Sequence, residues 1–429
     1  MRSLSIIFNP LITCSLIAFF FLGCASTTRA LRKSTDEIVT SPFYQNQFTG
    51  FMLYDPVARD TLYNLNGSRY FTPASNTKIF TLYSALQLLP DRIPSLKYVL
   101  ENDTLYIEGT GDPTLLHPYF QDSTAIKFLQ NHKDIALYLN NFEDAKLGPG
   151  WSWGDYQYYY QPERGPLPLY GNVVTISNTD SLRVTPFYFK DSVISINYSK
   201  NRNLESNTFY YALSRNDTTE IPYRTDSALT KTLLESLLGK EISLTPKMPK
   251  SEKNIVYGIA SDSVYKRMMH ESDNFLAEQL LFLASSTLLD TLNSNAVREY
   301  MIENQLSDLK QPPRWVDGSG LSRYNLFSPA SIVQVLDKLY QNTSRERLFT
   351  FFPAGGVSGT LEDWYAGNPD PYIYAKTGSL SNNHCLSGYL ITKSGKTLIF
   401  SFMNNHFRES SSEVKKRMQL VLEQIRDTY

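Results

Sequence analysis

The chain has 429 residues, of which 42% are hydrophobic and 13% aromatic, and its formal net charge at pH 7 is −1. Single cores stop growing at roughly 250–300 residues, so a chain of this length predicts at least two domains. The near-zero charge excludes recruitment of nucleic acid or of an anionic membrane by a general electrostatic field, and the aromatic content excludes a disordered chain.

Residues 1–24 have the layout of a secretory signal. Arg2 precedes an apolar run, Leu11–Leu22, which is shorter than the roughly 20 residues a spanning helix needs. Phe21–Cys24 is similar to a lipoprotein cleavage box, with Phe where Leu is usual. We therefore expect export, with the mature protein in the periplasm or anchored on the periplasmic side by a lipid on Cys24. A lipidated Cys24 would leave Cys385 alone in the mature chain, without a disulfide partner.

The first predicted elements are a tether, a hairpin and a helix. Residues 25–45 are polar and predict a tether. Phe51–Tyr54 and Thr61–Leu65 are strand-like runs on either side of a turn, which predicts a β-hairpin. From Ser75 to Pro90 the apolar residues recur at helical spacing, which predicts a helix that begins at the serine.

The middle of the chain differs in texture from both flanks. Residues 91–250 contain short alternating segments with many Asn and Asp, which predict a mainly β insertion. Helical patterns return over Val264–Leu288, and Cys385–Thr392 and Thr397–Asn404 predict a second hairpin, followed by a helix capped near Ser410. We therefore expect an α/β unit made of residues 46–90 and 251–429, split by the insertion.

Ser75-Asn76-Thr77-Lys78 is the first of three short motifs that together suggest chemistry. A spacing of three places Ser75 and Lys78 on one helix face, and an amine lowered in pKa by burial could take the hydroxyl proton. The N–H groups of the first helical turn lack intrahelical partners and could bind an oxyanion. In isolation the motif is also compatible with a helix N-cap followed by a solvated lysine.

Ser272-Asp273-Asn274 is the second motif, and it precedes a predicted helix. The Ser272 hydroxyl could relay a proton to a leaving amine, while the Asn274 amide could bind a substrate carbonyl and the lysine. The alternative is that Ser272 or Asp273 only caps the helix.

Lys376-Thr377-Gly378-Ser379 follows a strand-like run and is the third motif. Lys376 could supply a second cation, Gly378 would allow a substrate backbone to approach, and Thr377 and Ser379 could bind a terminal carboxylate. The Ser379 N–H could be a second oxyanion donor. The alternative interpretation is an exposed hairpin turn.

The three motifs, in this order, resemble those of the serine penicillin-binding proteins. Four further segments are similar to the class C low-molecular-mass D-Ala-D-Ala carboxypeptidase/endopeptidases: 111–115, 150–155, 317–325 and 352–361. The resemblance spans roughly residue 45 to the C-terminus. It implies a penicillin-binding-protein/serine β-lactamase-like transpeptidase domain, α/β (α+β) in class, with a central antiparallel sheet between helices.

The resemblance also implies a function. It implies cleavage of peptidoglycan stem peptides or their cross-links through an acyl-enzyme on Ser75, with β-lactam antibiotics as inhibitors. In the family an Asp after a Trp-x-Trp segment is thought to bind the diaminopimelate amine, and Asp155 is the matching position. The alternative for Asp155 is a strand-edge turn packed by Trp151 and Trp153.

Other chemistry finds less support. The five histidines show no pair at metal-ligand spacing, so we expect no metal and no cofactor, and no phosphate loop is present. A histidine-dependent serine triad stays open, since its members can be distant in the chain. The rival functions are a β-lactamase or esterase of the same fold and a non-catalytic peptidoglycan-binding lipoprotein.

Overall fold

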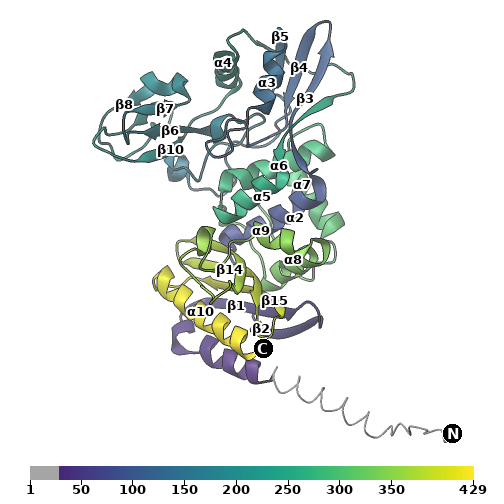
Figure 1. Ribbon diagram of the computed structural model, residues 1–429, viewed down its shortest axis with the longest axis vertical. Helices are drawn as coiled ribbons and strands as arrows, with labels where there is room; N and C mark the ends of the chain where they lie inside the picture. The colour runs from purple at the N-terminus through teal and green to yellow at the C-terminus, as the bar shows by residue number, and fades with distance from the viewer. Residues whose placement is uncertain (1–28) are drawn as a thin grey trace, which may run out of the picture.

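A five-stranded antiparallel sheet is the base of the molecule in the computed structural model, which describes residues 29–429 (Figure 1). Its strand order is β13-β14-β15-β1-β2, so the first hairpin of the chain pairs with the last. Both predicted hairpins are confirmed, and β1 and β15 join them. The strands are β1 (Phe48–Asp55), β2 (Asp60–Leu65), β13 (Ile373–Leu380), β14 (Asn383–Ile391) and β15 (Thr397–Asn405).

Helices cover both faces of this sheet. On one face α10 (Ser411–Thr428) packs a stripe of buried side chains that includes Val414, Met418 and Val421. On the other face lie α2 (Lys78–Leu88) and α8 (Pro329–Asn342). The expected α/β class, with a central antiparallel sheet between helices, is therefore confirmed.

The structure differs from the expected tether over its described part, residues 29–45. Residues 29–39 are helical, and Leu31 and Val39 of this segment are buried in the same cluster as α10. The Arg32 guanidinium donates to the Leu62 carbonyl oxygen at 2.9 Å, which ties the segment to β2. This short amphipathic helix has few apolar residues among many polar ones, so its sequence pattern does not predict a helix. The predicted signal segment 1–24 and Cys24 lie outside the described residues.

A layer of helices lies above the sheet. It contains α5 (Ser261–His270), α6 (Asn274–Leu288), α7 (Ser294–Tyr300) with the π-turn Met301–Gln305, and α9 (Arg345–Phe351). Helix α6 is buried from Phe275 to Ser286, which is typical of a helix in a core rather than on a surface. The helical pattern predicted over 264–288 is thus two helices, separated at Ser272, whose φ is 56°.

The insertion forms the far end of the molecule (Figure 1). Its main sheet has the order β11-β5-β4-β3-β12, and its last strand, β12, pairs with its first, β3, so the insertion extends to residue 260 rather than 250. A smaller sheet has the order β10-β6-β7. The strands are β3 (Arg92–Glu101), β4 (Thr104–Gly109), β5 (Asp134–Tyr138), β6 (Val173–Ser177), β7 (Arg183–Thr185), β8 (Val193–Ile194), β9 (Phe209–Tyr210), β10 (Thr218–Pro222), β11 (Ser243–Leu244) and β12 (Asn254–Ala260), with helices α3 (Thr124–Gln130) and α4 (Ser227–Leu238).

Candidate active site

Ser75 lies in a single 3₁₀ turn, Ala74–Thr77, immediately before α2. The α-helix begins at Lys78, three residues later than the sequence predicted, because the turn is wound more tightly. The Lys78 Nζ lies 3.0 Å from the Ser75 Oγ. The structure therefore brings the first predicted pair into hydrogen-bond contact.

Lys78 is fully buried and has two further partners. Its Nζ donates to the Asn274 Oδ1 and to the Ser319 carbonyl oxygen, both at 2.7 Å. Burial lowers the pKa of Lys78 to about 8, although the nearby carboxylates of Asp317, Asp273 and Glu278 raise it. A neutral amine has two hydrogens and one lone pair. With the hydrogens directed to those two acceptors, the lone pair faces the Ser75 hydroxyl.

In the segment Ser272–Asn274, one residue caps helix α6 and another faces the cleft. The Asp273 carboxylate caps α6 by accepting from the Leu276 N–H at 3.0 Å, as the alternative interpretation expected. Asn274 faces Lys78 with its oxygen, while its Nδ2 donates to the Tyr160 carbonyl oxygen at 3.0 Å. Tyr160 belongs to the insertion, so the insertion fixes which way the Asn274 amide points.

Strand β13 carries the third motif and is an edge strand of the sheet, as predicted. Lys376 is fully buried and its Nζ donates to the Thr377 carbonyl oxygen at 2.9 Å. Burial, and secondarily the charge of Lys78, holds the pKa of Lys376 well below its usual range. Lys78 thus lies close enough to Lys376 to oppose the protonation of Lys376, and Lys376 makes no direct hydrogen bond to Ser75.

The structure explains why residue 378 is a glycine, which the sequence alone did not explain. A Cβ at this position would lie 2.5 Å from the Pro73 carbonyl oxygen and 2.9 Å from the Asn76 nitrogen. The Asn76 Nδ2 also donates to the Lys376 carbonyl oxygen at 2.9 Å. Strand β13 therefore presses directly against the turn that carries the nucleophile, and only glycine allows that contact.

One cleft of about 840 Å³ collects most of the predicted residues. Lys78 and Lys376 lie buried beside it rather than in its lining. The predicted residues that line it are Ser75, Asp155, Ser272, Asn274, Thr377 and Ser379. The three motifs, far apart in the chain, thus meet at one cleft.

Asp155 enters the cleft from the insertion, on the 3₁₀ turn Trp153–Gln157. The strand-edge alternative for this residue is wrong, because the segment is a helical turn and Trp153 is 77% exposed rather than packed. Trp151 instead donates from its Nε1 to the Asp317 Oδ2 at 2.9 Å.

A buried polar network behind Lys78 was not predicted. Glu278 accepts from the Ser319 N–H at 2.8 Å and forms a 3.0 Å ion pair with Arg164, whose side chain is 1% exposed. This holds the Ser319 carbonyl against the Lys78 amine. The one sequence feature that could have indicated this network is Glu278, a carboxylate inside the apolar run of α6. Backbone carbonyls such as those of Ser319 and Tyr160 leave no residue-type signal.

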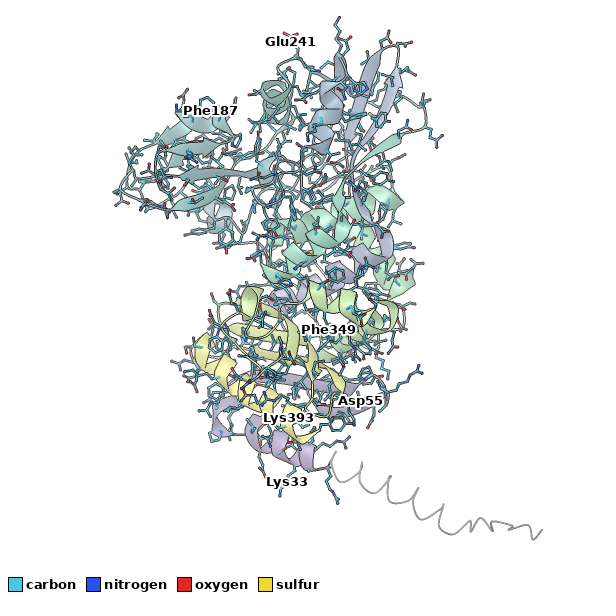
Figure 2. All side chains as sticks on the ribbon, in the orientation of Figure 1. Lys33, Asp55, Phe187, Glu241, Phe349 and Lys393 are labelled. Carbon is cyan, nitrogen blue, oxygen red and sulfur yellow. The ribbon has the colours of Figure 1, made fainter. Side chains whose placement is uncertain are left out.

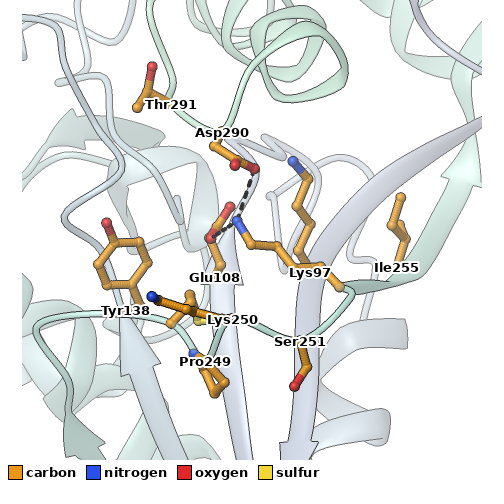
Figure 3. A pocket seen from close by; sticks show the side chains of 11 residues that line it. Lys97, Glu108, Tyr138, Pro249, Lys250, Ser251, Ile255, Asp290 and Thr291 are labelled. Carbon is orange, nitrogen blue, oxygen red and sulfur yellow. Dashed lines mark hydrogen bonds and ion pairs between the residues drawn. The ribbon is translucent and has the colours of Figure 1, made fainter.

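A second pocket lies in the insertion, away from the motifs (Figure 3). Lys97, Glu108 and Tyr138 lie in register on neighbouring strands of its floor. The Lys253 ammonium bridges Glu108 at 2.8 Å and Asp290 at 3.1 Å, and the Lys97 Nζ donates to a backbone carbonyl. Lys253 is thus paired with both carboxylates, and these contacts hold the segment that leads into β12 in place.

Within residues 29–429, no group of three or more His, Cys, Asp or Glu side chains is placed to hold a metal ion. Over the same residues, no helix combines the length and the apolarity that crossing a bilayer requires. Cys385 is buried and unpaired in β14, consistent with its predicted place in a strand.

The sequence model of one peptidase family matches the chain over residues 31–192 and 261–425. It belongs to the D-Ala-D-Ala carboxypeptidase 3 (S13) family. The S13 match leaves out residues 193–260, which hold the last strands of the insertion and α4.

Curated relatives cover nearly the whole chain at low identity. D-alanyl-D-alanine carboxypeptidase DacB of Haemophilus influenzae is 23% identical, with 89% of this chain and 91% of that protein aligned. D-alanyl-D-alanine carboxypeptidase of Actinomadura sp. (strain R39) is 22% identical over 94% of this chain and 87% of that protein. The crystal structure of penicillin-binding protein 4 (dacB) from Haemophilus influenzae superposes with a TM-score of 0.69 at 19% identity, over 92% of this chain and 99% of that one. The fold is therefore shared over 92% of this chain.

Proposed function

We propose that this S13 protein is a serine-type D-Ala-D-Ala carboxypeptidase/endopeptidase that acts on peptidoglycan stem peptides through an acyl-enzyme on Ser75. The observation that carries the proposal is the contact between the Lys78 Nζ and the Ser75 Oγ at 3.0 Å, with both remaining positions of the amine taken by acceptors at 2.7 Å. A buried amine of lowered pKa is an effective proton acceptor for a serine nucleophile.

The proposed reaction uses these groups in order. The Ser75 Oγ attacks the carbonyl carbon of the penultimate D-Ala, and its proton passes to Lys78. The peptide C–N bond then breaks, and the leaving amine takes a proton relayed by the Ser272 hydroxyl. Water hydrolyses the Ser75 ester: Lys78 accepts a proton from the attacking water, and this proton passes to the Ser75 Oγ as the ester C–O bond breaks. The N–H groups at Ser75 and Ser379 are the expected oxyanion donors.

The acyl step predicts covalent labelling by β-lactams, because a β-lactam presents a strained amide to the same serine. A related Haemophilus influenzae structure is described as complexed with a β-lactam. Incubation with fluorescent penicillin should label the wild-type protein on Ser75, as mapped by mass spectrometry of tryptic peptides. Ser75→Ala should remove the label, with Ser84→Ala, at a buried serine of α2, as the folded control.

Product analysis separates the proposed activity from its rivals. Release of D-Ala from muropeptides supports it. Fast nitrocefin turnover without D-Ala release would instead indicate a β-lactamase or esterase, and binding to sacculi with no Ser75-dependent product would indicate a non-catalytic module.

Asp155 is proposed to bind the side-chain amine of diaminopimelate, since it is a carboxylate in the same cleft as Ser75. Asp155→Asn should lower kcat/KM about tenfold on diaminopimelate peptides, a loss typical of a charge-assisted hydrogen bond. Peptides in which that amine is acetylated should show the same kcat/KM with both proteins. Equal losses on both peptides would contradict the assignment.

We further propose that the protein is exported and acts in the periplasm, with Cys24 as the lipid attachment site. Mass spectrometry of the N-terminal fragment from a membrane fraction tests this, and Cys24→Ala should release the protein into the soluble fraction.

A further inference from the structure

A serine–histidine pair lies at the rim of the cleft, outside the groups that act on Ser75. Ser379 and His384 face each other in the register of β13 and β14, and the Ser379 Oγ lies 2.8 Å from the His384 Nδ1. Both residues line the cleft, yet Ser379 is exposed and His384 is fully buried. The ring therefore supports the hydroxyl from behind.

The imidazole is neutral and holds a single hydrogen. Burial lowers the pKa of His384 to about 3, and the nearby charge of Lys415 adds to this effect. At any pH at which the protein is folded and active, one ring nitrogen is a donor and the other an acceptor.

The surroundings decide which nitrogen holds the hydrogen. The His384 Nε2 is buried and has no hydrogen-bond partner among the described residues. A hydrogen on Nε2 would be a buried donor without an acceptor, which native structures rarely contain. On Nδ1 the same hydrogen points at the Ser379 Oγ. The hydroxyl must then accept from the ring, and its own hydrogen is free to point into the cleft.

The other hydroxyl of the motif, that of Thr377, does not have its hydrogen available for a ligand. The Thr377 Oγ1 donates its hydrogen to the Thr360 Oγ1 at 2.7 Å. Ser379 is thus the hydroxyl of the third motif whose hydrogen remains for a ligand. Lys415, whose charge acts on His384, lines the same cleft, and the Asp363 carboxylate that lines it too acts on Lys415.

We propose that His384 is a positioning residue that commits the Ser379 hydroxyl to donate its hydrogen to the terminal carboxylate of the peptide substrate. The proposal rests on the proposed carboxypeptidase function and adds a device for recognising the chain end. A carboxylate only accepts hydrogen bonds, so a hydroxyl held as a donor recognises it, whereas a hydroxyl turned toward the ring would present a lone pair and repel it.

Two substitutions separate hydrogen bonding from packing. The side-chain amide introduced by His384→Asn keeps an N–H donor at the place of Nδ1, whereas His384→Leu removes the donor with similar bulk. We expect His384→Leu to raise KM for a D-Ala-D-Ala peptide roughly three- to tenfold, the size of one hydrogen bond, with kcat within about twofold. His384→Asn should stay within about twofold of the wild-type KM. Equal KM values for both variants would overturn the proposal.

A double mutant tests whether the ring acts through the hydroxyl. Ser379→Ala should raise KM by a similar factor, and adding His384→Leu to Ser379→Ala should cause no further rise. Additive losses would assign His384 a packing role and contradict the inference.

The tautomer itself can be read on the wild-type protein, where a variant serves only to assign the signal. With ¹⁵N-labelled histidine, the ring signals that disappear in His384→Asn or in any soluble variant at position 384 identify this residue among the five histidines. We expect a proton-bearing Nδ1 and a bare Nε2 across pH 6–8, whereas the opposite tautomer or a protonated ring would refute the assignment. D-Ala release is measured in a separate assay, and its absence in the wild type would contradict the proposed function rather than the role of His384.

Discussion

Buried lysines are rare because removing an ammonium from water is costly, and this cleft has two of them beside it. Lys78 and Lys376 are both fully buried, and the charge on Lys78 opposes protonation of Lys376. Near neutral pH the pair therefore holds fewer protons than two free lysines would. This is the property that a proton acceptor for Ser75 requires.

The lowered pKa of Lys78 predicts a pH profile for acylation. Below about 8 the amine is protonated and has no lone pair for the Ser75 proton, so the acylation rate should rise about tenfold per pH unit up to that value and then level off. The rate of fluorescent penicillin labelling between pH 6 and 10 measures this. A rate that is flat from pH 6 to 9 would contradict Lys78 as the titrating base.

At the scale of elements, the loop 317–325 presses on the nucleophile turn through Gly320. A Cβ on Gly320 would lie 1.8 Å from the Ala74 carbonyl oxygen, next to Ser75, and the φ of Gly320 is 83°. Gly395 has the same φ of 83°, but a Cβ there would meet nothing within 4 Å. The two glycines thus share the same φ and differ in what a Cβ would contact.

Gly320→Ala should therefore abolish or strongly reduce penicillin labelling, because the turn must shift. Gly395→Ala should keep full labelling and cost about 1 kcal/mol of unfolding free energy, the penalty of a left-handed alanine. Labelling rates and urea unfolding curves of both variants check this. Equal labelling of the two would show that the loop does not position Ser75.

Local patterns explain what the sequence could predict at this scale. Both hairpins and the final helix have clear periodicity, and the motif residues were named because side-chain types reveal chemistry. The folded structure of segment 29–45 was not predicted because only a few of its side chains, such as Leu31 and Val39, are buried. The end of the insertion was missed because β12 is defined by pairing with β3, which lies far away in the chain. The Ser319 and Tyr160 carbonyls act through backbone atoms, which any residue could supply.

At the scale of the whole molecule, Arg164 joins the insertion to the helical layer. Its ion pair with Glu278 has both side chains 1% exposed, so neither charge can turn to water if the other is lost. Arg164→Met should lower the unfolding free energy by about 3–5 kcal/mol, as expected for a broken buried pair.

The surface pair between Arg347 and Asp262, with both side chains 44% exposed, provides the matched control. Arg347→Met should cost at most about 1 kcal/mol. Urea unfolding of the two variants at one protein concentration measures the difference. Similar losses for both would mean that the insertion is not joined to the core through Arg164.

The packed segment 29–39 has a consequence for where such an enzyme could work. Lys33 of that segment and Glu241 of the insertion mark opposite ends of the molecule (Figure 2). Five Cα–Cα steps lead from Cys24 to residue 29, a distance of at most about 18 Å for a fully extended chain. A lipid on Cys24 would hold the sheet end against the bilayer and point the insertion outward. Its reach would then be limited to wall strands within about one molecular length of the membrane.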